Sequence, residues 1–170
     1  LDGSNLLTSG VVNSLAAQNA TGGSTITFTG IPAGVKRVTV MFNSIIGTTV
    51  PPRFQLSTSG GYVTSGYICS MAYAYNSNYW ANNDTTGFVI SPPQPWGNGV
   101  TSNGTMFLTL MPSNTWVFSG TQGYSTGTYS PGCGTCNGYV NLGGVLTAIR
   151  MTAQNGTDSF TGGTVNVFYE

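Results

Sequence analysis

Apolar side chains alternate with small or polar ones near the end of the chain, and this period of two constrains the fold more than any other feature. Residues 145–153 and 165–169 both follow the pattern. Such alternation is typical of a strand with one buried face. Between the two runs stands Asn155-Gly156, a dipeptide that tolerates the positive φ angles of a tight turn. The sequence therefore predicts that residues 144–170 form a closing β-hairpin.

The same alternation recurs along the chain, and no window shows a sustained apolar period of 3.6 residues. The further predicted strands are residues 24–29, 37–42, 54–56, 66–75, 88–90, 106–111, 115–119 and 139–142. Short strands separated by Gly- and Asn-rich turns favour an antiparallel β-sandwich, jelly-roll-like, over a barrel. We expect one such domain over residues 24–170. Residues 1–23 are small and polar, and we expect a linker or the end of an upstream shaft.

One predicted strand, residues 66–75, places large side chains on a single face. They are Tyr67, Cys69, Met71, Tyr73 and Tyr75. We interpret this face mainly as core, because aromatic stripes are usually buried. The alternative is that its last tyrosines form an exposed binding wall.

Charged residues are scarce: four Lys plus Arg and four Asp plus Glu make up 5% of 170 residues. Globular domains usually contain about 25%. A net charge of zero leaves no basic surface for nucleic acid, and no apolar run is long enough for a membrane helix. Few charges are available to protect sheet edges from pairing with other chains. We therefore expect an obligate homo-oligomer.

The residues for common catalytic chemistry are missing or scattered. Without histidine, the chain cannot form a Ser-His-acid triad or a histidine metal site. Glycoside hydrolysis usually needs two carboxylates, but Asp2, Asp158 and Glu170 lie in the expected linker, a turn and the terminus. Only Asp84 lies in a promising predicted loop. We therefore expect no enzyme, no metal and no cofactor.

Three cysteines leave several states open. Cys133 and Cys136 have the spacing of a redox motif, but they lie in a predicted Gly-rich loop, residues 120–138, rather than at a helix N-terminus. We favour a local disulfide between them. Free thiols, or a metal or cross-chain contact that includes Cys69, remain the alternatives, since zinc needs four ligands.

Two predicted loops have the composition of a carbohydrate-binding surface. Aromatic rings cover the apolar faces of sugars, while amide and hydroxyl groups pair with sugar hydroxyls. Residues 76–86 and the proline-rich residues 91–97 combine these groups. The candidate receptor-binding residues are Tyr79, Trp80, Asn82, Asn83, Asp84 and Trp96.

The sequence also resembles the C-terminal regions of bacteriophage tail fibres and related phage adhesins. The similar segments are ITFTGIPAGVKRVTVMFNSI, TSGY, TTGF, MFLTLMPSNTWVFSG and the ending LTAIRMTAQNGTDSFTGGTVNVFYE. They follow the same order across residues 24–170. The chain departs from the pattern at Gly34, where Trp is common, at Thr161, where Asp is common, and in the loop from Cys133 to Cys136.

The resemblance implies a homotrimeric, β-rich fibre tip that attaches a phage to its bacterial host. It implies no catalytic residues and does not assign receptor-binding ones. Combined with the loop composition, it predicts binding to a bacterial surface polysaccharide or another envelope receptor. The expected location is the virion, outside the cell when functional, after assembly in the host cytoplasm. The alternatives are a purely structural fibre or capsid-decoration protein, and a polysaccharide-degrading tailspike.

Overall fold

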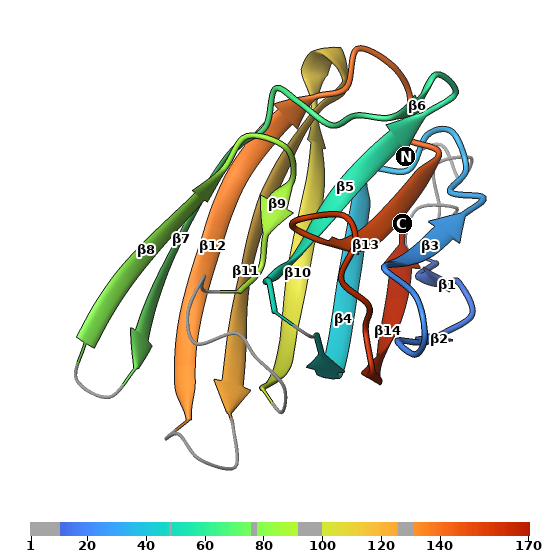
Figure 1. Ribbon diagram of the computed structural model, residues 1–170. Coiled ribbons are helices and arrows are strands. Elements are labelled where there is room, and N and C mark those ends of the chain that lie inside the picture. The colour runs from blue at the N-terminus through green and yellow to red at the C-terminus, as the bar shows by residue number, and fades with distance from the viewer. Residues whose placement is uncertain (1–10, 48, 76–77, 92–99, 126–130) are drawn as a thin grey trace.

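The computed structural model describes residues 11–47, 49–75, 78–91, 100–125 and 131–170, which are almost entirely β-structure. Two antiparallel sheets pack around one apolar core (Figure 1). This confirms the predicted all-β antiparallel sandwich. None of the residues described forms a helix with the length and apolar character that a membrane span would need.

The large sheet contains nine strands within the described ranges, in the spatial order β1-β14-β4-β10-β11-β12-β7-β8, with β2 also paired to β14. Its strands are β1 (Asn13–Ser14), β2 (Gln18–Asn19), β4 (Arg37–Ile46), β7 (Ile68–Tyr75), β8 (Asn78–Asp84), β10 (Thr101–Met111), β11 (Thr115–Ser125), β12 (Gly132–Asn141) and β14 (Gly162–Tyr169). The 3-10 turn Pro112–Asn114 joins β10 to β11.

The small sheet contains five strands within the described ranges, in the order β3-β13-β5-β6, with β9 also paired to β5. Its strands are β3 (Thr25–Thr29), β5 (Pro52–Thr58), β6 (Gly61–Tyr62), β9 (Phe88–Val89) and β13 (Ala148–Ala153). Figure 1 shows β3, β13 and β5 on one side of the view and β7 and β8 on the other. The large sheet therefore extends beyond the small one.

The core forms where the apolar faces of the two sheets meet. The predicted inward positions in β3, β4 and β5 are buried, which confirms their alternation; they are Ile26, Phe28, Val38, Val40, Phe42, Phe54 and Leu56. Aromatic contacts join the sheets: the ring centroids of Phe42 and Phe54 lie 6.2 Å apart. The rings of Phe88 and Phe118 stack at 4.4 Å. Burying side chains of this size stabilises the fold by about 1.5–3 kcal/mol each.

The large face of β7 is also core, as interpreted from the sequence. Cys69, Met71 and Tyr73 are buried, and so is Tyr67 immediately before the strand. The Tyr67 hydroxyl accepts a hydrogen bond from the Leu56 amide at 2.8 Å and donates one to the Val63 carbonyl at 3.1 Å. These bonds fix the chain entering β7 against β5.

The predicted closing hairpin is wrong. The Asn155-Gly156 turn does form, and the Gly156 amide donates to the Ala153 carbonyl at 2.9 Å. However, β13 lies in the small sheet and β14 in the large sheet, so the two strands do not pair. After the turn, the Asp158 carboxylate accepts hydrogen bonds from the amides of Thr49 and Val50. These contacts hold the connection where the chain crosses between sheets.

The predicted loop over residues 120–138 is wrong where the structure describes it. β11 continues to Ser125 and β12 begins at Gly132. The glycines in this segment do not form a loop. They let neighbouring strands approach each other closely. A Cβ on Gly138 would lie 2.2 Å from the Ile68 carbonyl oxygen, and one on Gly120 would lie 2.6 Å from that of Thr105.

The expected boundary at residue 24 does not separate the preceding residues from the sheet. β1 and β2 both pair with β14, and Ala20 is fully buried. Residues 11–23 therefore belong to the sandwich. Residues 1–10 of the predicted linker lie outside the described ranges.

Replacing Tyr67 by Phe keeps the buried ring but removes the hydroxyl. We expect the free energy of unfolding to fall by about 1–2 kcal/mol, because the Leu56 amide loses its acceptor. Urea denaturation at pH 7 measures the difference. Tyr139→Phe, at an exposed position, is the control and should change stability by less than about 0.5 kcal/mol.

The same variant tests a pH dependence. Burial raises the pKa of Tyr67 to about 12, above its value of about 10 in an unfolded chain. The stabilisation is therefore complete below pH 10 and is lost as the pH rises from 10 to 12. The wild type should lose more stability across this window than Tyr67→Phe. Parallel pH profiles would contradict the assignment.

Candidate functional site

The predicted recognition loop over residues 76–86 is mostly strand. β8 covers Asn78–Asp84 and pairs with β7 in continuous register at the edge of the large sheet. The prediction was wrong because this edge strand is exposed on both faces through much of its length, which hides the alternation. Its asparagines also resembled turn residues. Residues 76 and 77 lie outside the described ranges.

Strand geometry splits the candidate residues between two faces. Tyr79 and Asn83 point to the outer face of the large sheet, because successive side chains alternate. Trp80, Asn82 and Asp84 point to the inner face, where Trp80 opposes the buried Tyr73. The sequence-predicted cluster is therefore not one site. Trp96, the remaining candidate, lies outside the described residues.

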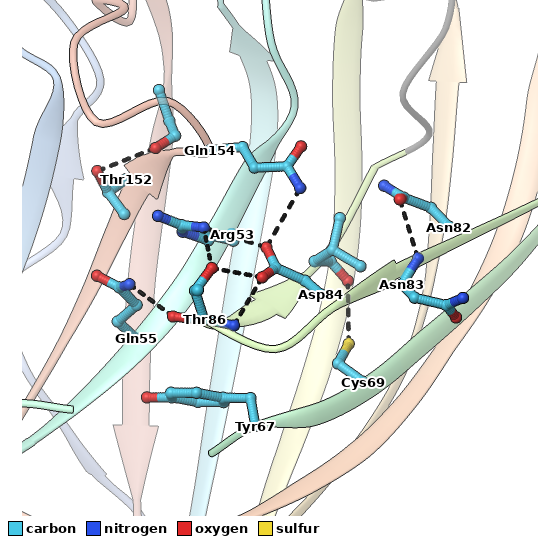
Figure 2. A network of polar contacts seen from close by, with 12 residues as sticks. Arg53, Gln55, Tyr67, Cys69, Asn82, Asn83, Asp84, Thr86, Thr152 and Gln154 are labelled. Atoms are coloured by element: carbon cyan, nitrogen blue, oxygen red, sulfur yellow. Dashed lines mark hydrogen bonds and ion pairs between the residues drawn. The ribbon is translucent and has the colours of Figure 1, made fainter. Parts of the chain in front are cut away.

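Asp84 is the centre of a buried polar network that joins the two sheets (Figure 2). One of its carboxylate oxygens lies 3.2 Å from Nη1 of Arg53 on β5 and 3.3 Å from Nε2 of Gln154, which follows β13. The other accepts the Thr86 amide at 2.7 Å. Asp84 is only 7% exposed, so it has no accessible face for a receptor.

The network continues away from Asp84 along β5. The Gln55 side chain donates to the Thr86 carbonyl at 2.6 Å and accepts two bonds from Arg150 at 2.7 and 2.9 Å. The Arg150 guanidinium also lies 4.1 Å from the ring centroid of Tyr62. Both arginines of the small sheet are thus held in structural contacts. We interpret the network as a clasp between the end of β8 and the small sheet.

Asp84→Asn should lower the free energy of unfolding by about 3 kcal/mol, because removing one partner leaves the mostly buried Arg53 charge uncompensated. Chemical denaturation measures the loss. Glu170→Gln breaks the exposed Arg37–Glu170 pair and should cost less than about 1 kcal/mol. Equal losses in the two variants would contradict the clasp.

A shallow hollow of about 370 Å³ lies beside Tyr79, across β7, β8, β11 and β12. Four lining residues, Tyr73, Trp80, Gln122 and Gly134, stand at inner-face positions. Alternation places the other six on the outer face of the large sheet. They are Ala72, Ala74, Tyr79, Thr121, Cys133 and Thr135. Small side chains form the floor, and Tyr79, which is 86% exposed, supplies a freely accessible ring.

The surface of the hollow is mostly apolar, and its lining includes two threonines but no charged residue. Thr121 and Thr135 lie directly opposite each other on β11 and β12, and Thr135 lies opposite Ala72 on β7. The threonines were not predicted as part of a site because residues 120–138 were assigned to a loop. Ala72 and Ala74 were not predicted either, because they belong to the predicted strand over residues 66–75 rather than to a recognition loop. The alternation of β7 was the available signal, since it put Ala72 and Ala74 on the face opposite the core.

Trp80 contributes to a different arrangement. Its ring lies nearly parallel to that of Tyr73, with centroids 6.5 Å apart and an interplanar angle of 13°. Tyr73 in turn makes an edge contact with Tyr124 at 6.1 Å. Trp80 therefore extends the inner aromatic cluster toward the sheet edge. It remains 52% exposed.

The cysteines are free, which contradicts the favoured local disulfide. Cys133 and Cys136 are three residues apart on β12, so they point to opposite faces; Cys133 is exposed and Cys136 is buried. Burial raises the pKa of the Cys69 thiol to about 11 and raises that of Cys136 as well. Both buried thiols therefore stay protonated and unreactive at neutral pH.

A thiol titration without reductant should find one reactive group in the native protein, Cys133, and three after denaturation. Absorbance of an aromatic disulfide reagent counts them. Cys133→Ser should remove the native signal and leave two thiols in the denatured chain. One thiol in the denatured wild type would instead indicate a bridge.

Within the described ranges, no three His, Cys, Asp or Glu side chains lie together in a way that could hold a metal ion. The Tyr79 hollow instead combines an exposed aromatic ring and two threonines with a mostly apolar surface. Asn83 is exposed on the same face.

No family model and no curated protein matches the sequence. Among solved structures, the chain is weakly similar to one described as "Structure of infectious bursal disease virus Gt strain". The two are 9% identical with a TM-score of 0.15, and the match covers 93% of this chain and 40% of the other. A similarity this low carries no argument about fold or function.

Proposed function

We propose that this chain is the receptor-binding tip of a bacteriophage fibre and that it attaches to the host by holding an uncharged surface glycan in the Tyr79 hollow. The observation that carries the proposal is an exposed aromatic ring beside a mostly apolar, uncharged hollow that also contains two threonines. The volume of about 370 Å³ falls within the range of roughly 300–1,000 Å³ that is usual for small-molecule sites. The tail-fibre resemblance supports the biological setting.

The chemistry of the lining favours a neutral sugar. A tyrosine ring can cover the apolar face of a pyranose, and threonine hydroxyls can donate to and accept from its hydroxyl groups. An acidic sugar would need a cation, whereas the described lining contains no charged residue. Arg53 and Arg150 are held in the clasp instead.

The proposal includes assembly as a homo-oligomer on the virion, with a trimer as the form that the resemblance implies. Several copies of a weak site bind one polymeric ligand more tightly than a single copy does, because later binding events are intramolecular. A shallow hollow is compatible with such multivalent binding. Each copy needs only modest affinity for a repeating polysaccharide.

The test is binding of the purified chain to immobilised bacterial surface polysaccharides, neutral and acidic, followed by titration of those that bind. Tyr79→Ala should weaken binding about tenfold, equivalent to about 1.4 kcal/mol. Val145→Ala is the control, since it shortens an exposed apolar side chain that does not line the hollow. It should change affinity by less than about twofold, within experimental scatter.

Two results would contradict this assignment. Loss of binding in Trp80→Ala with normal binding in Tyr79→Ala would place the site on the inner face. Failure of the wild type to bind any of the polysaccharides would favour a purely structural fibre protein. Thr135→Val, which removes only a hydroxyl from the hollow, gives an independent check and should also weaken binding.

A further inference from the structure

The structure distinguishes three Asn-Gly dipeptides that are alike in the sequence. Within the described ranges they are Asn103-Gly104, Asn137-Gly138 and Asn155-Gly156. An asparagine followed by glycine can lose its side-chain amide without an enzyme, because glycine has no side chain to obstruct attack by its backbone nitrogen. The attack needs a backbone that can rotate until this nitrogen reaches the asparagine Cγ atom. Backbone freedom therefore decides which pair reacts in the folded protein.

Asn137-Gly138 has an exposed asparagine but a fixed backbone. It lies within β12, where Asn137 is opposite Ser119 on β11 and Ser70 on β7. Hydrogen bonds to strands on both sides hold the main chain extended. The glycine is also tightly packed, since a Cβ on Gly138 would lie 2.2 Å from the Ile68 carbonyl oxygen. The asparagine side chain is accessible, but the sheet prevents the rotation that the reaction needs.

Asn103-Gly104 is held by both its backbone and its side chain. Both residues lie in β10 and pair with β11. A Cβ on Gly104 would lie 2.6 Å from the Thr121 carbonyl oxygen. The Asn103 side-chain oxygen accepts a hydrogen bond from the Ser44 amide at 2.8 Å. This pair is therefore also fixed in the folded protein.

Asn155-Gly156 differs from both, because it forms an exposed turn after β13 and belongs to no strand. Gly156 has a φ of 74°, and a Cβ on it would lie in open space. Its amide donates a turn hydrogen bond to the Ala153 carbonyl at 2.9 Å. A bond at an exposed turn opens more readily than a ladder between neighbouring strands. The nitrogen of Gly156 can therefore change its orientation without disturbing a sheet.

The side chain of Asn155 is also polarised for the reaction. Its Oδ1 atom accepts hydrogen bonds from the amides of Thr157 at 3.1 Å and Asp158 at 3.0 Å. Both donors point at the oxygen on which negative charge develops when a nitrogen attacks Cγ. Donors placed in this way stabilise the developing charge. The turn thus combines a mobile nucleophile with an activated carbonyl.

We propose that Asn155 is a site of spontaneous deamidation in the folded protein. The Gly156 nitrogen forms a bond to Cγ of Asn155, and the side-chain amide nitrogen leaves as ammonia, taking up through solvent the proton that Gly156 loses. Water then opens the resulting succinimide ring. Opening at Cγ gives aspartate, whereas opening at the main-chain carbonyl carbon gives isoaspartate. This proposal depends on neither glycan binding nor oligomer formation.

The modification affects the connection between the two sheets. The Asp158 carboxylate accepts hydrogen bonds from the amides of Thr49 and Val50 where the chain crosses. The isoaspartate product adds a methylene carbon to the main chain and displaces the oxygen that holds the Thr157 and Asp158 amides. Both products also place a second negative charge close to residue 158, where it repels the first. The modified protein should therefore be less stable.

The test is incubation of the native protein at neutral pH, followed by peptide mass spectrometry. Cleavage after Arg150 releases residues 151–170, in which 155–156 is the one Asn-Gly pair. Replacement of the amide by a carboxyl group raises the mass of this peptide. Cleavage after aromatic residues separates Asn103 from Asn137. Asn155 should react at least about tenfold faster than either, equivalent to about 1.4 kcal/mol of additional opening free energy for the strands.

The denatured protein is the first control. In guanidinium chloride the three pairs should react at similar rates, because the folded backbone no longer distinguishes them. Asn155→Gln should abolish the native reaction, since the longer side chain does not form the succinimide ring. Asn137→Gln, at an exposed strand position, is the matched variant and should leave the reaction at Asn155 unchanged.

The proposal is overturned if Asn155 stays unmodified in the native protein, or if Asn137 reacts there as fast as Asn155. Ion exchange separates the deamidated fraction through its added negative charge. This fraction should unfold at a lower denaturant concentration than the unmodified one. Equal midpoints would overturn the stated effect on the connection between the sheets.

Discussion

The contact between the inner faces of the two sheets is the interaction on which the rest of the structure depends. The chain has few charged groups to spread over a surface, so its stability rests on one apolar core that both sheets share. The stacked pair Phe88–Phe118 and the tilted pair Phe42–Phe54 bridge this core. Most strands that carry the surface features have their other face buried there, whereas β8, which carries Tyr79, is exposed on both faces through much of its length.

The clasp around Asp84 extends this arrangement to the edge of the large sheet. β8 lies beyond most of the small sheet and has only β7 as a neighbouring strand in the large sheet. Asp84 at its end is tied to Arg53 and Gln154, which belong to or follow strands of the small sheet. A buried polar network of this kind fixes geometry more strictly than apolar contacts do, because its hydrogen bonds are directional. It thereby positions the strand that carries Tyr79.

Strand pairing decides what two surface regions can do. At the Tyr79 hollow, it brings an exposed aromatic ring beside small side chains and two threonines, a combination suited to an uncharged ligand. In β12, it holds Asn137-Gly138 extended, whereas the same dipeptide at residues 155–156 lies in an exposed turn. The hollow contains no charged residue among its lining residues, which agrees with the composition of the chain.

The sequence by itself determined which face of most strands is buried. Alternation at Ile26 and Phe28, at Val38 and Val40, and from Tyr67 to Tyr73 is a local property, because each side chain only has to point toward some core. The all-β class and the antiparallel sandwich follow from such local signals. For the same reason, the alternation in β13 and β14 identified each segment as a strand but did not show which strand each one pairs with.

Only the tertiary structure decided which strands pair and which residues meet. β13 and β14 separate into different sheets, although they are neighbours in the chain. The Asn-rich segment before Asp84 becomes an edge strand, and this sends Tyr79 and Trp80 to opposite faces. Cys133 and Cys136 are separated in the same way once their segment is extended by pairing with β11 and β7. These outcomes depend on contacts between residues far apart in the sequence, whose geometry no local pattern encodes.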